Sequence, residues 1–169
     1  KRSDYRVDFI CTDGHPRNVV NNIYHFYMVM ASDGLTFELF KTDGTSFGNY
    51  DLDGSLNSGS AIPIEVGDMT EIYDGSATNA WVHDLCEIGG TLYGAIVTYT
   101  GGTTGGGAFT YKMGKLVGST WTWETVCDGG GTANDYFFAD QTHYAGGIAL
   151  DPNSPLRVLA SRKYSAGNF

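Results

Sequence analysis

The chain has 169 residues, of which 41% are hydrophobic, 14% aromatic and 17% charged, and 24 are glycine. This composition excludes a disordered tail, which would carry fewer aromatic and more charged residues, as well as a coiled coil or a collagen. The formal net charge of −9 argues against a nucleic-acid partner. No stretch approaches the roughly 18 consecutive apolar residues of a membrane span.

Alternation of apolar and polar residues is the dominant pattern, and it predicts half-buried strands. In the first such run Val7 and Phe9 alternate with Arg6 and Asp8. The run at 23–30 instead carries apolar and aromatic residues on both faces. Strands are predicted, in chain order, at 5–12, 23–30, 35–41, 70–73, 82–88, 91–99, 109–116, 120–126, 147–150 and 157–161.

Turn signals separate these runs. Asp-Gly and Gly-Gly pairs recur between them, and glycine supplies the positive φ that tight hairpin turns require. No window carries a sustained apolar stripe with a period of 3.6 residues. The sequence therefore predicts an all-β protein built from antiparallel hairpins.

The strand groups repeat along the chain. The strand–turn–strand group around Leu85 recurs 64 residues later around Ala149, and a related group precedes it by 76 residues. Repeats on this scale suit the blades of a β-propeller. We expect approximate blade units at 1–79, 80–143 and 144–169, the last incomplete. Because propellers close with about four to eight blades, the rest of the ring would come from missing blades or from other chains.

Five motifs, taken in order, resemble a known family. They are TDGHPR at 12–17, NIYHFY at 22–27, DGT at 43–45, AWVHD at 80–84 and GGIALDPNSP at 146–155. They are similar to the bacterial neuraminidase repeat (BNR) propellers, which include polysaccharide lyases acting on ulvan and related rhamnose–glucuronate glycans, and some glycoside hydrolases. The resemblance implies a seven-bladed propeller with the glycan in a groove across one face. It also implies proton transfer by His and Tyr, and neutralisation of the uronate by Arg.

Candidates for this chemistry begin with His15 and Arg17, in a Gly-His-Pro turn at the end of a strand. Abstraction of a proton beside a uronate carboxylate needs a base, a cation on the carboxylate and an acid. His15 would be the base or the acid, and Arg17 would bind the carboxylate through its bidentate fork. The alternative is an ordinary turn in which Asp13 bonds its own backbone.

Further candidates lie on the strands and near the end of the chain. His25 is either catalytic, with Tyr24 or Tyr27 as its partner, or a satisfied histidine that belongs to the core or lines a channel. His83 is a candidate for binding, although Asp84 points to the opposite face of a strand and should not orient it. Three more candidates fall in the last part of the chain, namely Tyr144 as the acid and His143 and Arg162 as binding residues.

Metal and cofactor signals are weak. No pair of histidines has the spacing of a zinc site, and the Asp-Gly turns lack the order of a calcium loop. We assign no cofactor from the sequence, and a structural metal ion is the one bound group that we consider. Cys11, Cys86 and Cys127 lie in apolar stretches and are expected to be buried small hydrophobes, with one disulfide plus a free thiol as the alternative.

The leading hypothesis is an extracellular propeller that binds an acidic, uronate-containing polysaccharide and cleaves it by β-elimination or hydrolysis. The alternative is a non-catalytic glycan-binding adhesin or a receptor-binding part of a phage tail fibre, and a third interpretation is a purely structural piece. These hypotheses place the protein outside the cell, in the periplasm or on a virion surface.

Overall fold

The computed structural model describes residues 5–32, 34–51, 64–101, 107–130 and 146–161. These residues form eleven β-strands and one short 3-10 helix, and no α-helix occurs among them. All strand pairs are antiparallel, as predicted. Within the described ranges the sheets do not close into a barrel or a propeller.

The first sheet has the order β1-β2-β3-β4, and β5 also pairs with β2. Residues 23–25 of β2 pair with β5, whereas residues 26–30 pair with β3. One edge of β2 therefore pairs with two different strands, and the pairing passes from β5 to β3 between His25 and Phe26. The strands are β1 (Arg6–Thr12), β2 (Ile23–Met30), β3 (Thr36–Lys41), β4 (Ser46–Asp51) and β5 (Thr70–Tyr73), with the 3-10 helix η1 (Val66–Asp68) before β5.

The second sheet is a four-stranded meander in the order β6-β7-β8-β9. Gly89 and Gly90, with φ of 58° and 79°, form the two-residue turn between β6 and β7. Positive φ at both positions is the type I′ geometry that matches the twist of the strands. The strands are β6 (Asn79–Ile88), β7 (Thr91–Tyr99), β8 (Phe109–Val117) and β9 (Thr120–Gly130).

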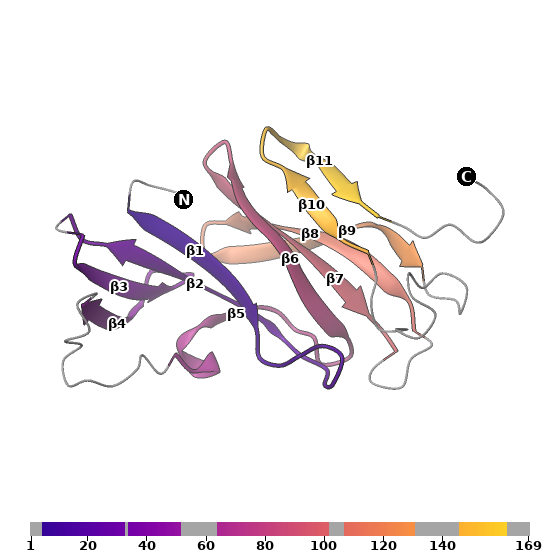
Figure 1. Cartoon of the computed structure of the whole chain (residues 1–169), viewed down its shortest axis with the longest axis horizontal. Coiled ribbons are helices and arrows are strands. Elements are labelled where there is room, and N and C mark those ends of the chain that lie inside the picture. The colour runs from indigo at the N-terminus through magenta and orange to yellow at the C-terminus, as the bar shows by residue number, and fades with distance from the viewer. Residues whose placement is uncertain (1–4, 33, 52–63, 102–106, 131–145, 162–169) are drawn as a thin grey trace.

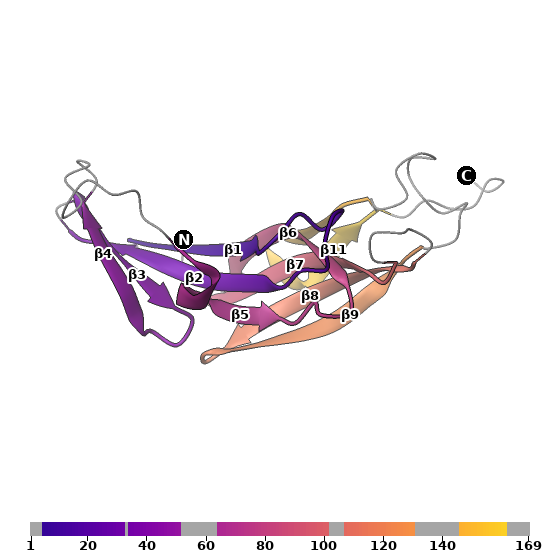
Figure 2. The same cartoon turned by 90° about the horizontal axis from the view of Figure 1, so that it is seen from below.

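The third sheet is the hairpin of β10 (Ile148–Asp151) and β11 (Ser154–Ala160). The three sheets follow one another in chain order, from indigo to yellow (Figure 1). Strand β6 lies between β1 and β10 and contacts both. Figure 2 shows the outer strands β3 and β4 bending away from the second sheet.

Two apolar cores hold the sheets together, one on each face of the second sheet. Strand β7 is therefore buried almost from end to end. Trp123 joins the first core to the first sheet, because its indole N–H donates to the Ile72 carbonyl at 2.6 Å. The first core contains Ile23, Ile72, Ala80, Leu92, Ile96, Leu116 and Trp121. The second contains Ile88, Tyr93, Ala95, Val97, Tyr99, Phe109, Tyr111, Ile148 and Leu150.

Strand β1 buries its polar face rather than its apolar one. Val7 and Phe9 are 38% and 37% exposed, whereas the side chains of Arg6 and Asp8 are only 18% and 3% exposed. Alternation alone would place Val7 and Phe9 inward. The polar face turns inward because its charged groups find partners there, and Phe9 stacks on Phe26 at 4.8 Å on the outer face.

Candidate functional site

His25 is fully buried and is hydrogen-bonded at both ring nitrogens. Nε2 lies 3.1 Å from Oδ1 of Asp8, and Nδ1 lies 2.8 Å from Oγ1 of Thr42. Because the Asp8 carboxylate accepts, Nε2 carries a hydrogen and donates. His25 is thus placed in the core, next to Trp121 at 5.5 Å between ring centroids, and away from solvent. This geometry is that of the satisfied core histidine.

Asp8 receives a second partner from its own strand. The Arg6 guanidinium donates to both carboxylate oxygens, with a closest contact of 2.6 Å, and its Cζ lies 3.4 Å from the centroid of the Tyr27 ring. Burial, the largest single influence, raises the pKa of Asp8. The hydrogen bonds from His25 and Arg6 and the charge of Arg6 outweigh it, so the pKa lies below its ordinary value.

Tyr24 lies on the opposite face of β2 from His25, because neighbouring strand residues alternate. Its hydroxyl donates to Oδ2 of Asp13 at 3.3 Å and accepts a long hydrogen bond from the Asn22 side chain at 3.4 Å. Burial raises the pKa of Tyr24, and the nearby Asp13 and Glu71 carboxylates add to the effect. Tyr24 and His25 therefore do not share a site.

The loop between β1 and β2 is anchored to the start of β6 by two buried asparagines. The Asn79 side chain, with no exposed surface, donates to the carbonyls of Pro16 and of Val19, the latter at 2.8 Å. Asn21 pairs its amide with both backbone groups of Ala80, at 2.8 and 2.9 Å. Because a buried amide N–H without an acceptor is costly, the hydrogen bonds donated by Asn79 and Asn21 fix the path of the loop.

His15 and Arg17 project from this anchored loop, and both are exposed. The backbone N–H of Arg17 donates to Nδ1 of His15 at 3.2 Å. A backbone N–H is always a donor, so neutral His15 carries its hydrogen on Nε2. The turn therefore fixes the backbone at Arg17 against the His15 ring, and the loop presents an imidazole N–H donor and an exposed guanidinium.

A shallow hollow of about 380 Å³ lies beside His15, where the end of β1 meets the start of β6. Trp81 forms part of its wall and packs edge-on against Tyr99 at 6.4 Å between ring centroids. The wall thus combines an apolar surface with the polar loop. The hollow is lined by Cys11, Thr12, His15, Pro16, Trp81 and Val82.

His83 stands at a β-bulge in β6. Val82 pairs with Ile96 and Asp84 with Ala95, so the register shifts at His83. The side chain is exposed, but surrounding protein atoms remove enough water to lower the pKa of the imidazole, and the Asp84 charge opposes this shift. Along β6, His83 directly follows Trp81 and Val82, which line the hollow, but His83 is not itself a lining residue.

The predicted residues do not all converge. His15 and Arg17 share the anchored loop, His25 is in the core, and Tyr24 lies in a separate polar cluster with Asp13. The remaining three candidates, His143, Tyr144 and Arg162, lie outside the described residues.

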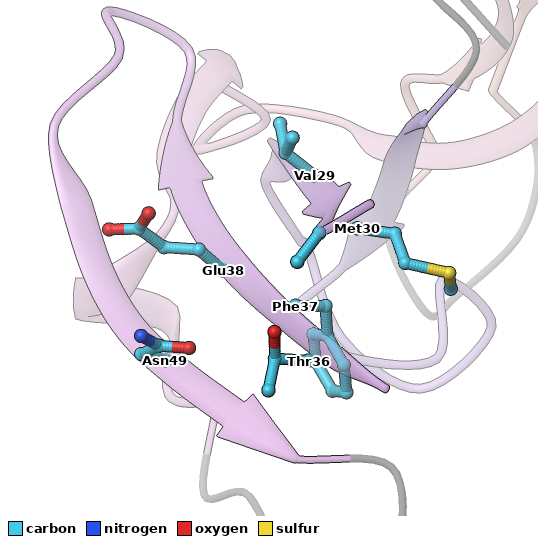
Figure 3. Close-up of a pocket in the computed structure, with 7 residues that line it drawn as sticks. Val29, Met30, Thr36, Phe37, Glu38 and Asn49 are labelled. Atoms are coloured by element: carbon cyan, nitrogen blue, oxygen red, sulfur yellow. The ribbon is translucent and has the colours of Figure 1, made fainter. Parts of the chain in front are cut away.

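A second hollow, of about 170 Å³, lies on the outer part of the first sheet (Figure 3). Glu38 and Asn49 are cross-strand partners and project on the same side of the β3–β4 hairpin. None of the residues predicted from the sequence lines this hollow. It is lined by Val29, Met30, Ala31, Thr36, Phe37, Glu38 and Asn49.

Within the described ranges, no three His, Cys, Asp or Glu side chains gather into a group that would hold a metal ion. Cys11, Cys86 and Cys127 are free thiols, so they form no disulfide. Cys11 and Cys86 are half-buried, but the expectation that Cys127 is buried is wrong. Cys127 lies on β9, which among the described strands pairs with β8 alone and so forms an edge of the sheet.

No helix in the described part of the chain is long and apolar enough to cross a membrane. Comparison with known proteins adds no relative: no family model, curated protein or solved structure matches the chain. The resemblance to BNR propellers therefore stays a prediction made from the motifs of the sequence.

Proposed function

We propose that this chain binds an acidic, uronate-containing polysaccharide at the hollow beside the β1–β2 loop. The observation that carries the proposal is the anchoring of that loop by the fully buried Asn79 amide. A loop held in this way fixes the backbone from which His15 and Arg17 project, which lowers the entropy cost of binding.

The side chains around the hollow suit the parts of such a sugar. The Arg17 guanidinium matches a carboxylate in bidentate geometry. The Nε2–H of neutral His15 donates to a hydroxyl or carboxylate oxygen, and the half-buried Trp81 offers an apolar surface to the face of a pyranose ring. Because the chain carries a net charge of −9, recognition of an anion depends on these local cations rather than on the overall field.

Binding is better supported than cleavage. As a base, His15 would have to accept a proton at Nε2, but Nδ1 is occupied by the Arg17 N–H, which leaves the hydrogen of the neutral ring on Nε2. The alternative partner His25 is buried and bonded to Asp8 and Thr42. We therefore favour a glycan-binding module, in an adhesin, a tail fibre or the binding part of a larger enzyme, and an extracellular, periplasmic or virion-surface location.

The finer fold proposed is a partial propeller whose blades are the three sheets. Its support is that consecutive antiparallel sheets pack face to face in chain order, with the second sheet between the others. The five strands of the first sheet and the shared edge of β2 depart from a simple four-stranded blade.

Isothermal titration of the purified chain with ulvan, and with neutral dextran as the reference glycan, tests the proposal. We expect heat of binding with ulvan only, and loss of most of the affinity in Arg17→Ala. Arg157→Ala is the matched control, because Arg157 is 72% exposed on the third sheet and does not line the hollow. Equal affinity of the two variants and wild type would overturn the proposed site. Release of unsaturated uronate in the same mixture would show that the chain also cleaves.

A further inference from the structure

The outer face of the first sheet, which points away from the second sheet, is apolar. The inner face carries Asp8 and His25, and neighbouring residues of a strand alternate between the two faces. Residues that pair across strands share a face, so the register defines the rows of side chains on the outer one. Three rows result, namely Phe9–Phe26–Lys41, Val7–Met28–Leu39–Gly48 and Met30–Phe37–Tyr50. Lys41 is the one charged residue in them.

Part of this outer face is open to solvent, although its residues are those of a core. Val7 and Phe9 are exposed. Phe9 stacks on Phe26, and Phe26 contacts Phe47 at 6.2 Å between ring centroids, so the aromatic rings form a continuous surface. Large contiguous apolar patches are rare on soluble monomers and mark interaction sites. The outer face is therefore suited to being covered by another apolar surface.

The third sheet exposes a second apolar surface. Ile148 and Leu150 belong to the second core, so Ala149 and its cross-strand partner Leu159 point away from it. Leu159 is 68% exposed, and Leu156 in the same hairpin is 94% exposed. A hollow of about 370 Å³ lies on this hairpin. It is lined by small or apolar residues, namely Gly147, Ile148, Ala149, Leu159, Ala160 and Ser161.

These two surfaces lie at the two ends of a stack of sheets. The first core joins the first sheet to the second, and the second core joins the second sheet to the third. Figure 1 shows the second sheet between the other two. Its two faces are covered, whereas the first and third sheets each leave one apolar surface exposed. Because the two exposed surfaces are different, contact between them in two copies would continue the packing that already exists within the chain.

We propose that copies of this chain associate head to tail, with the outer face of the first sheet of one copy on the third-sheet hollow of the next. Such a heterologous contact produces a ring or a filament. The inference is independent of the proposed glycan site, because neither Phe9 nor Leu159 lines the hollow beside His15. Each copy carries a net charge of −9, so the copies repel one another and added salt should strengthen the association.

The test is sedimentation velocity of the purified chain over a range of concentrations. We expect wild type to form species larger than the monomer. Phe9→Arg and Leu159→Arg, each alone, should weaken association more than about tenfold, because every contact then buries an unpaired guanidinium. An equimolar mixture of the two variants should form dimers and nothing larger, because one contact between them keeps both surfaces intact.

Val117→Arg is the matched control, because Val117 is exposed at the end of β8 and belongs to neither surface. It should assemble as wild type does. Circular dichroism checks that the variants fold. If loss of the Phe26 stack unfolds Phe9→Arg, Val7→Arg tests the same surface at a second exposed position.

Three results would overturn the proposal. The first is a wild-type chain that stays monomeric at every concentration. The second is a Leu159→Arg variant that associates as wild type does while Phe9→Arg does not, because two outer faces would then pair with each other. The third is a mixture of the two variants that remains monomeric. Glycan binding, measured through Arg17→Ala, is unaffected by any of these results.

Discussion

Asp8 and His25 are diagonal neighbours on paired strands, and Oδ1 of Asp8 lies 3.1 Å from Nε2 of His25 in the core. The network extends through Thr42, whose hydroxyl lies 2.8 Å from the ring and whose backbone N–H donates to Thr70 of β5 at 3.0 Å. It therefore joins β1, β2, the end of β3 and β5 at the point where β2 changes partner. We conclude that His25 links the strands of the first sheet through this hydrogen-bond network.

Replacement of His25 by Ala should destabilise the fold strongly. It removes the hydrogen bonds that the ring makes to Asp8 and Thr42 and opens a cavity beside Trp121, so we expect a loss of about 3 kcal/mol in the free energy of unfolding. Urea denaturation measures this loss. The matched control is His83→Ala, an exposed position, which should change stability by less than about 0.5 kcal/mol. A small effect of His25→Ala would contradict the structural role.

The Asp8 network should also make stability sensitive to acid. The pKa of Asp8 in the folded chain lies below its ordinary value of 3.8, so the unfolded chain binds the proton first as pH falls. The stabilisation is therefore complete above that ordinary pKa and disappears as pH drops through the lower folded value. Urea midpoints between about pH 5 and pH 2 follow this loss. Asp8→Asn, although less stable overall, should show a shallower slope.

Exposed carboxylates provide the comparison for this acid effect. A hydrogen bond from the Thr45 backbone lowers the pKa of Asp43, which lies in an exposed turn. Asp43→Asn should leave most of the slope of wild type in place. If Asp43→Asn and Asp8→Asn flatten the slope equally, the buried network is not its main source.

Asn79→Ala should weaken glycan binding without touching a proposed contact residue. The carbonyls of Pro16 and Val19 lose their donor, which costs about 1–3 kcal/mol and loosens the loop that carries Arg17. We expect faster hydrogen exchange in the loop together with lower affinity for ulvan. Asn49→Ala, at an exposed amide on β4, is the control and should change neither. Unchanged affinity in Asn79→Ala would show that loop anchoring is irrelevant to binding.

Gly114→Ala should weaken the packing between the first two sheets. A Cβ at Gly114 would lie 2.7 Å from the Trp123 ring, so the ring must move and its hydrogen bond to Ile72 is strained. We expect a loss of about 1–3 kcal/mol in thermal or urea unfolding. Gly67→Ala is the control, because a Cβ there meets nothing within 4 Å. Equal stability of the two variants would contradict the tight packing at Trp123.

The three thiols should react in a fixed order. Cys127 is exposed, whereas burial raises the pKa of Cys11 and of Cys86 and so lowers their thiolate fraction. With a disulfide reagent such as DTNB at mildly alkaline pH, one thiol should react fast and two slowly. Cys127→Ser should remove the fast phase. Three equal rates would show that the cysteines are equally accessible.

The strands could be predicted largely from local pattern. The ranges 23–30, 70–73 and 91–99 match β2, β5 and β7, because alternation and β-branched or aromatic content mark them. Strand β4 was not predicted, since its sequence SFGNYD contains Gly, Asn and Asp, which are depleted in strands. It forms because β3 offers a hydrogen-bonding edge. Local propensity does not include such a tertiary contact.

The site was harder to predict, because its decisive contacts are distant in sequence. Nothing local marks Asn79 as the residue that holds Pro16, or Asp8 as the partner of His25. The inward polar face of β1 follows only once the register of β1 and β2 is known. The exposed turn at His15, by contrast, could be predicted from its Gly-His-Pro sequence.

The most direct test of the central claim is an NMR titration of the ¹⁵N-labelled chain with a uronate oligosaccharide. The proposed site predicts that amide shifts concentrate in the loop at 13–19 and around Trp81 and Val82, and that Arg17→Ala suppresses them. Shifts that instead centre on the hollow near Glu38 and Asn49, or no saturable shifts at all, would contradict the account.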